Sequence, residues 1–260
     1  MWGLEIEGAD CAEGFNKDTM ESNAENQAGL TFRPASPADV ADAVPLIYSS
    51  GPAAFDYVFN TGGARDAQAF LRFAYLDGGG EFGWRAHRVA EIGRRVAATG
   101  AAFDGRAVLR FTIANALLIL RFYGPILAWG VMIRGLRTET VLQPPQAQDY
   151  YLCHVGVRAG LRGQGIGARF MRHLLQGLDA DRHRRATLDV AATNPRAQLL
   201  YERLGFVVEA LRVSKLQNQR GRVADHYRMS RPAGDKVQSH AGMGSSQQNG
   251  CREPRVRGDV

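Results

Sequence analysis

The sequence predicts a mixed α/β domain in which strands and helices are interleaved. Three observations predict this fold class. Segments with alternating apolar residues and segments with apolar residues every three or four positions follow one another along the chain. Gly, Pro and Asn stand between these segments, where turns and helix caps need them. No internal repeat is present, and 45% of the 260 residues are hydrophobic, which suits a chain that buries its own core.

The first half of the chain contains two capped helices between strands. Ser36 supplies an N-cap and Pro37 a first helical residue, so a helix is expected to run to about Tyr48. A second helix begins near Ala67, and the glycines at 78–80 end it. The strands predicted in this half are residues 30–34, 87–92 and 95–103, the last two joined by a tight turn around Gly93.

A long apolar segment, residues 111–133, follows these strands. It is long enough to span a membrane, but Arg121 splits it and Gly124-Pro125 breaks it. We therefore expect a buried helical hairpin or a lid on the core rather than a transmembrane helix. The segment is also compatible with a role as a wall of the acceptor pocket or as a dimer face. The candidate walls are Phe111, Phe122, Tyr123 and Trp129.

The second half of the chain repeats the alternation after the Pro144-Pro145 linker. Its strands and helices interleave closely, and the last two strands are expected to pair antiparallel. The predicted strands are residues 149–157, 186–191, 206–215 and 224–230, and the predicted helices are residues 165–178 and 194–204.

The charge is unevenly distributed and suggests three regions. Residues 1–28 hold seven acidic residues and one lysine, lack a periodic apolar pattern and are expected to form a flexible acidic tail. Residues 232–260, rich in Gly, Ser and Gln, are expected to be disordered. Residues 29–231 form the predicted domain. The central region is strongly basic, so nucleic acid, acidic partners and a phosphorylated cofactor all fit its charge.

The cysteines and the N-terminus indicate a compartment. Cys11, Cys153 and Cys251 are an odd, widely spaced set, which predicts neither a disulfide framework nor a metal site. The chain starts with an acidic stretch and shows no export signal. We expect a cytoplasmic protein with reduced thiols and no bound metal.

A glycine-rich turn opens the helix at 165–178. Gly163, Gly165 and Gly167 follow a strand and precede the helical pattern. Backbone amides at such a turn meet at the positive end of the helix dipole, and glycine lets a bulky anion reach them. Arg162 is placed to add a charged contact. The turn therefore predicts a phosphate site.

Two known phosphate-binding loops, the Walker loop and the dinucleotide-binding loop, have glycine patterns similar to this turn. The Walker loop fails, because Ala168-Arg169 follows where Lys-Ser/Thr is needed. The dinucleotide fingerprint fits formally: Gly163, Gly165 and Ala168 match it, and Asp189 stands where a ribose-binding acid belongs. However, about 120 residues of the predicted domain precede the turn, whereas such fingerprints usually follow a first strand.

The downstream sequence favours another family. Residues 186–206 read ATLDVAATNPRAQLLYERLGF, with Asn194 and Pro195 at the start of a helix and Gly205 at its end. Together with RGQGIGA at 162–168, this segment resembles the GNAT superfamily of acetyl-CoA-dependent N-acetyltransferases. With the strands beside them the two motifs cover roughly residues 150–213, a quarter of the chain, and their order and spacing make the resemblance specific.

The resemblance implies a fold and a coenzyme site. The fold is a mixed, mostly antiparallel sheet with two splayed parallel central strands and helices on both faces. The loop amides hold the coenzyme A diphosphate, and the pantetheine arm lies between the splayed strands. The residues implied to bind the coenzyme are Val155, Val157, Arg162, Gly163, Gln164, Gly165, Ile166, Gly167, Ala168, Asn194, Ala197 and Tyr201.

The implied reaction moves an acetyl group from acetyl-CoA, a co-substrate, to a primary amine through a tetrahedral intermediate. Tyr201 suits the role of acid for the departing thiolate, because a phenol is protonated at neutral pH. The base is open: His154 and Glu91 are the main candidates, and Asp149 and Tyr150 are further ones. None of these is carried over from the family.

The acceptor and partners are open as well. A small-molecule amine and a protein amino group both fit, a homodimer is compatible, and we expect no nucleic-acid or membrane partner. Two other functions stay open: an NAD(P)-binding oxidoreductase using Gly163, Gly165 and Ala168, and a non-catalytic coenzyme A sensor.

Overall fold

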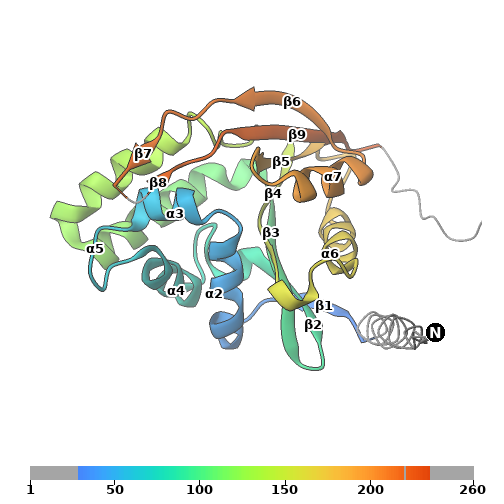
Figure 1. Ribbon diagram of the computed structural model, residues 1–260, viewed down its shortest axis with the longest axis horizontal. Coiled ribbons are helices and arrows are strands. Elements are labelled where there is room, and N and C mark those ends of the chain that lie inside the picture. The colour runs from blue at the N-terminus through green and yellow to red at the C-terminus, as the bar shows by residue number, and fades with distance from the viewer. Residues whose placement is uncertain (1–28, 220, 235–260) are drawn as a thin grey trace, which may run out of the picture.

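The computed structural model describes residues 29–219 and 221–234 and has a seven-stranded sheet at its centre (Figure 1). The strand order is β1-β2-β3-β4-β5-β9-β6, and only the β4–β5 pair of this sheet is parallel. A two-stranded sheet pairs β7 with β8. The strands are β1 (Thr31–Pro34), β2 (His87–Ile92), β3 (Arg95–Asp104), β4 (Asp149–Val157), β5 (Arg185–Ala191), β6 (Val207–Arg212), β7 (Gln217–Asn218), β8 (Gly221–Arg222) and β9 (His226–Pro232).

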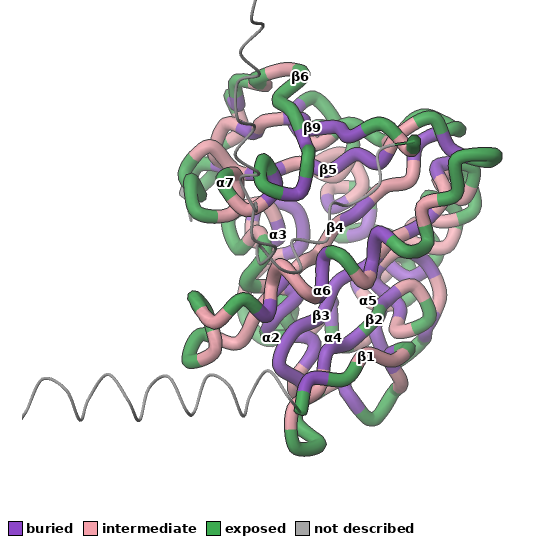
Figure 2. The backbone as a smooth tube through the Cα atoms, turned by 90° about the vertical axis from the view of Figure 1, so that its right-hand side faces the viewer, coloured by how far each residue is buried: buried purple, intermediate pink, exposed green. Residues whose placement is uncertain are grey.

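Helices cover both faces of this sheet, so the chain builds two apolar cores (Figure 1). One core lies under α2 to α5 and the other under α6 and α7. Figure 2 shows buried backbone concentrated in the strands between these two layers. The α-helices are α2 (Val40–Ser49), α3 (Pro52–Phe59), α4 (Ala67–Asp77), α5 (Val108–Thr138), α6 (Ile166–Leu175) and α7 (Pro195–Arg203), and the 3-10 helices are η1 (Pro37–Asp39), η2 (Trp84–Ala86), η3 (Gly105–Ala107) and η4 (Ala159–Leu161).

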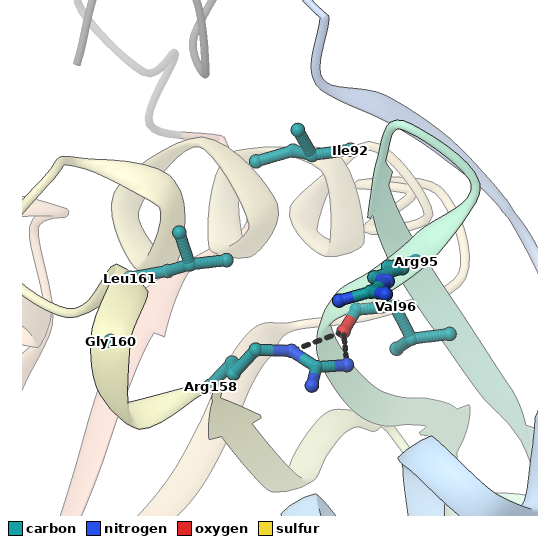
Figure 3. A pocket seen from close by; sticks show the side chains of 6 residues that line it. All are labelled: Ile92, Arg95, Val96, Arg158, Gly160 and Leu161. Carbon is teal, nitrogen blue, oxygen red and sulfur yellow. Dashed lines mark hydrogen bonds between the residues drawn. The ribbon is translucent and has the colours of Figure 1, made fainter. Parts of the chain in front are cut away.

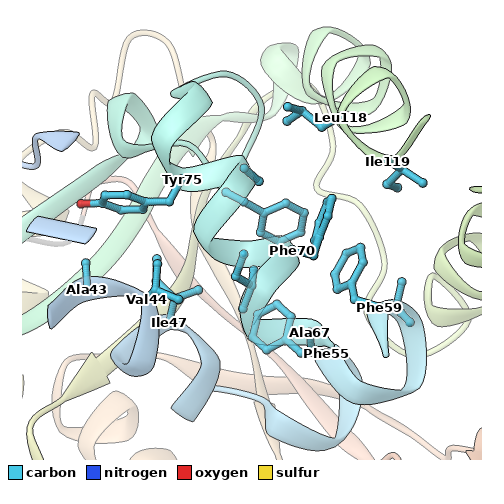
Figure 4. Packing of buried hydrophobic residues seen from close by; sticks show 14 of the residues in the cluster. Ala43, Val44, Ile47, Phe55, Phe59, Ala67, Phe70, Tyr75, Leu118 and Ile119 are labelled. Atoms are coloured by element: carbon cyan, nitrogen blue, oxygen red, sulfur yellow. The ribbon is translucent and has the colours of Figure 1, made fainter. Parts of the chain in front are cut away.

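Aromatic rings fill the core under α2 to α5 (Figure 4). Phe70 is completely buried, and its ring centroid lies 4.3 Å from that of Phe59. Tyr123 of α5 joins the same cluster, and its hydroxyl donates a hydrogen bond to the Phe59 carbonyl. These contacts bury one side of α5 against α3 and α4.

Most sequence-predicted elements are confirmed, because their signals are local. Ser36 and Asp39 form a complete capping box at the start of η1. Gly78 ends α4 in the left-handed conformation, at φ 80°. The strand at 149–157 has the predicted bounds, whereas α6 ends at Leu175, three residues before the predicted end. The α3 helix was not predicted, and the expectations for residues 1–28 and 235–260 lie outside the described residues.

The apolar segment forms two helical stretches that meet at a kink, and one side of it packs on the core. Gly124 has non-helical angles and interrupts α5, as its position before Pro125 predicts. Residues 105–138 are long and apolar enough to cross a membrane. The expected burial is wrong, because only 28% of the most apolar 18-residue stretch of this segment is buried. Phe122 and Tyr123 contact the core, whereas Trp129 is 67% exposed.

Candidate functional site

The parallel strands β4 and β5 separate soon after they pair. Their register joins Asp149 with Arg185 and Tyr151 with Thr187, and it continues no further within the described chain. Both strands extend several residues beyond this point. The predicted splay of two central parallel strands is therefore confirmed, and it opens the sheet between its two halves.

A β-bulge in β4 lies beside the splay. His154 and Val155 together stand opposite the single residue Gly100 of β3, and His154 has a positive φ of 55°. The His154 ring stacks on that of His87, with centroids 5.5 Å apart. Burial, with a smaller contribution from His87, lowers the pKa of His154 to about 3. The imidazole is thus neutral at pH 7 and a weak base.

The glycine-rich turn precedes α6 and has an open backbone. Gly163 and Gly165 adopt positive φ values of 82° and 78°, which favour glycine. A Cβ on Gly163 would meet no atom within 4 Å. Within residues 29–219 and 221–234, the amides of Gly163, Gly165, Ile166, Gly167 and Ala168 have no hydrogen-bond acceptor.

Arg162 contributes less to this turn than the sequence predicted. Its amide already donates to the Ala159 carbonyl at 3.3 Å, so it is not available to an anion. The guanidinium donates to the Val157 carbonyl at 3.0 Å. The Gln164 side-chain amide donates to the Gly160 carbonyl at 3.2 Å. The open amides therefore begin after Arg162.

Gly167 is the point where β4, α6 and α7 meet. A Cβ added to this glycine would lie 3.5 Å from both Val157 of β4 and Leu200 of α7. The strand, the turn and the second motif helix are thus brought together, although they are far apart in sequence. Val155, Val157, Ala197 and Leu200 all pack against the core under α6 and α7.

Tyr201 lies on α7 in the same core. Its ring is 9% exposed and packs edge-on against Phe206 at 6.1 Å. Burial raises the pKa of its phenol to about 12. Its hydroxyl makes no hydrogen bond to the residues that the structure describes, so the proton is not committed elsewhere. Asn194 caps α7, and its Oδ1 accepts from the Ala197 amide at 3.2 Å.

Three other sequence candidates are engaged in structural contacts. Glu91 is paired with Arg33 at 2.6 Å on β1 and β2, two strands from β4. Asp149 accepts from Arg185 at 2.9 Å, and the Tyr150 hydroxyl donates to the Leu174 carbonyl at 3.1 Å. The structure does not bring Glu91 together with Tyr201.

Sequence reasoning missed Glu81. This carboxylate follows the glycines that end α4 and accepts a hydrogen bond of 3.0 Å from Asn115 of α5. Burial raises its pKa to about 7, against the opposing effect of the Asn115 bond. Its negative charge also contributes to the raised pKa of the Cys153 thiol on β4. Only the fold reveals this position, because nothing around Glu81 in the sequence signals a site.

The negative charge of Asp189 on β5 also contributes to the raised pKa of Cys153. It accepts a hydrogen bond of 2.8 Å from the Tyr151 hydroxyl and pairs with Arg228 at 3.3 Å. Burial raises its pKa to about 6, opposed by Arg228 and Tyr151. Because this carboxylate is held among buried partners, it does not support the role of a ribose-binding acid.

A hollow of about 290 Å³ lies beside the start of the glycine-rich turn (Figure 3). Its lining includes Gly160 and Leu161 of η4, but none of residues 163–168. Arg158 borders it and donates to the Val96 carbonyl. No group of three or more metal-ligating side chains occurs in the described part of the chain.

Part of the chain is similar in sequence to known acetyltransferases. Residues 130–206 match the model of the acetyltransferase (GNAT) family. The 5-NmdU N-acetyltransferase of Pseudomonas phage PaMx11 is 36% identical over 76 residues, which are 29% of this chain and 51% of that protein. The chain thus spans about half the length of this relative.

Solved structures show the same fold. An N-acetyltransferase from Staphylococcus aureus Mu50 is 17% identical, with a TM-score of 0.56, over 77% of this chain and 99% of that one. A second acetyltransferase structure is 16% identical, with a TM-score of 0.56, over 78% and 99%. At these identities the likeness concerns the fold alone.

Proposed function

We propose, from the match of residues 130–206 to the GNAT acetyltransferase family, that this chain is an N-acetyltransferase of that family. It moves the acetyl group of acetyl-CoA to a primary amine by direct attack. The observation that supports this most is the set of open amides at Gly163 and at 165–168, in the turn and helix that follow β4, together with the separation of β4 and β5. An oxidoreductase is not supported, because Asp189 is engaged within the protein.

The open turn fits a diphosphate. The amides of Gly163, Gly165, Ile166, Gly167 and Ala168 point from the start of α6, where the helix dipole favours an anion. Gly163 leaves space where a side chain would stand. These amides hold the coenzyme A diphosphate, with Arg162 and Gln164 at the rim of the turn. The bound coenzyme supplies the acetyl thioester.

The gap between β4 and β5 fits the pantetheine arm. Val155 and Val157 offer backbone groups along one side, since the β4–β5 ladder ends at Tyr151. Asn194 and Ala197 border the gap from α7. An amide near the His154 bulge polarises the thioester carbonyl and stabilises the oxyanion of the tetrahedral intermediate.

Tyr201 is the proposed acid. With a pKa of about 12, its phenol is protonated at neutral pH and can donate to the departing thiolate. Its ring position is fixed by the core and by Phe206. The free hydroxyl needs no rearrangement before it donates.

Glu81 is the proposed base, in place of His154 and Glu91. Its pKa of about 7 suits proton transfer at neutral pH, whereas His154 is too weakly basic and Glu91 is paired with Arg33. Glu81 takes a proton from the acceptor ammonium, directly or through a water. The neutral amine then attacks the thioester carbonyl. As the intermediate collapses, the C–S bond breaks and Tyr201 protonates the sulfur, while the second proton lost by the attacking nitrogen returns to Tyr201 through solvent.

The acceptor is proposed only as a class. The name of the phage relative specifies 5-NmdU as its substrate, and the aligned part covers about half of that protein. The carboxylates of Glu81 and Asp189 both act electrostatically on Cys153 of β4, so a primary amine that arrives as a cation suits this region. Cys153 is a free thiol in the structure, which fits the cytoplasm as the proposed compartment.

Release of free thiol from acetyl-CoA in the presence of a panel of primary amines tests the proposal. We expect release that depends on one or more amines, and coenzyme A but not NAD(P) should raise the melting temperature. Binding without amine-dependent release would instead indicate a coenzyme A sensor. Stabilisation by NAD(P) alone would contradict the proposal.

A further inference from the structure

The outward side of α5 carries an unusual apolar surface. Eight of the fourteen exposed large hydrophobic residues of the described chain lie on this helix. In its first half, Leu109, Ile113, Leu117 and Leu120 recur at helical spacing and so share one face. We call the eight residues the α5 apolar face: Leu109, Ile113, Leu117, Leu120, Ile126, Leu127, Trp129 and Leu136.

The same helix carries only positive charge. Residues 108–138 contain four arginines and no acidic residue. Arg110 and Arg137 are exposed and form no ion pair with the described residues. Arg121 is exposed as well, and it pairs with Asp77 of α4. Two exposed arginines without an ion pair among the described residues, Arg110 and Arg137, therefore lie near the two ends of the helix that carries the α5 apolar face.

We propose that the α5 apolar face docks on an anionic membrane surface. A helix with Leu, Ile and Trp on one side and arginine beside them lies in the boundary between headgroups and acyl chains. Anionic lipids attract the arginines, and burial of the apolar side chains completes the contact. The sequence alone predicted no membrane partner, because it indicated that this segment was buried.

Two features favour docking over spanning. The inward side of α5 is committed to the protein core through Leu118, Ile119 and Tyr123. Arg134 also donates to the Val58 carbonyl of α3 at 3.0 Å. The kink at Gly124 breaks the helix near its middle. Insertion across a bilayer would have to break these contacts, whereas docking leaves them intact.

A second copy of the chain fits this face less well. A symmetric contact through α5 would bring the arginines of both copies together, because residues 105–138 provide no carboxylate to pair with them. Figure 1 shows α5 at the end of the molecule away from α6 and α7. Docking through α5 therefore leaves the glycine-rich turn accessible.

Sedimentation of the full chain with lipid vesicles tests the proposal. We expect binding to vesicles of phosphatidylcholine with phosphatidylglycerol, and little binding to phosphatidylcholine alone. Replacing Ile113 and Leu117, which are 55% and 56% exposed, with Ser (I113S with L117S) should lower the bound fraction about tenfold. Arg110→Gln with Arg137→Gln should reduce binding to the anionic vesicles and leave the weak binding to phosphatidylcholine vesicles unchanged.

Matched control variants distinguish binding through the α5 apolar face from nonspecific adsorption to vesicles. Leu211→Ser with Val213→Ser removes two residues of similar exposure, 50% and 62%, on and beside β6, and Arg203→Gln removes an exposed charge on α7. These variants should bind vesicles like the parent chain. Circular dichroism confirms that all variants are folded. Three results would each overturn the proposal: no binding to anionic vesicles, equal binding by the α5 variants, or a dimer that I113S with L117S dissociates. None of these results depends on acetyl transfer.

Discussion

The carboxylate of Glu81 accepts a hydrogen bond of 3.0 Å from the side-chain amide of Asn115. This bond joins the loop after α4 to the helix inserted between β3 and β4. The neutral amide is the only side chain that donates a hydrogen bond to Glu81 among the described residues. Burial therefore dominates its pKa, and the carboxyl is poised to exchange a proton near pH 7.

Glu81→Gln should remove the proposed base. We expect kcat to fall by about a hundredfold or more, because general-base catalysis contributes roughly that much. In the parent chain, activity should rise with pH through about 7, where Glu81 loses its proton. The variant should lack this rise. A pH profile of acetyl transfer, with Glu91→Gln as the matched control, checks this; an identical profile for Glu81→Gln would exclude it as the base.

Glu81 also links stability to pH. Its pKa in the folded chain is raised to about 7 by burial, so folding favours the protonated form. The stabilising effect is therefore complete at low pH and is lost as pH rises through 7. Glu81→Gln should remove this decline in the free energy of unfolding. Urea unfolding at a series of pH values below and above 7 measures the free energy of unfolding. The same pH dependence in the parent chain and in Glu81→Gln would contradict the burial of Glu81.

Tyr201→Phe should separate binding from turnover. The ring contacts with Phe206 remain, so the affinity for coenzyme A should be unchanged. Turnover should fall by about a hundredfold, because the acid for the departing thiolate is lost. Calorimetric titration with coenzyme A and a thiol-release assay measure the two quantities. Normal turnover would remove Tyr201 from the mechanism.

Gly163→Ala should impair coenzyme binding, and Gly93→Ala is its matched control. Both glycines have a positive φ, 82° and 54°, and a Cβ at either meets no atom within 4 Å. Each substitution should therefore cost about 1–2 kcal/mol in stability from backbone strain alone. Only Gly163→Ala should weaken coenzyme A binding markedly, since its Cβ enters the proposed diphosphate site. Equal affinity in both variants would argue against that site.

Gly156→Ala should destabilise the chain, because α2 lies directly on β4 at this glycine. A Cβ here would lie 2.2 Å from the Leu46 carbonyl oxygen, whereas at Gly160 it would meet no atom within 4 Å. Overpacking of this kind costs about 1–3 kcal/mol. Thermal melting of Gly156→Ala and Gly160→Ala tests this, and equal melting temperatures would contradict the close contact.

The element boundaries that the sequence predicted correctly depend on interactions between residues that are close in the chain. The capping box at Ser36, the glycine that ends α4 and the Asn194 cap of α7 act within a few residues, so they fix element bounds without knowledge of the fold. The splayed strands were implied by the resemblance to the GNAT superfamily, and no local signal in this sequence predicts them.

The remaining features depend on long-range packing. The hydrogen bond to Glu81 comes from Asn115 of α5, 34 residues further along the chain. The His154 bulge requires a positive φ at a residue that rarely adopts one. The apolar residues of α5 were expected to be buried, since composition does not show which side of a helix has a partner. Arg162 was expected to offer its amide, which the short helix η4 already uses.

The backbone amides of the glycine-rich turn provide the most direct test. Nitrogen-15 NMR of the full chain, titrated with coenzyme A, reports on Gly163, Gly165 and Gly167 individually. We predict that these three amide signals shift strongly with coenzyme A and remain in place with NAD. Saturable binding of coenzyme A that leaves all three signals unchanged would contradict the proposed site.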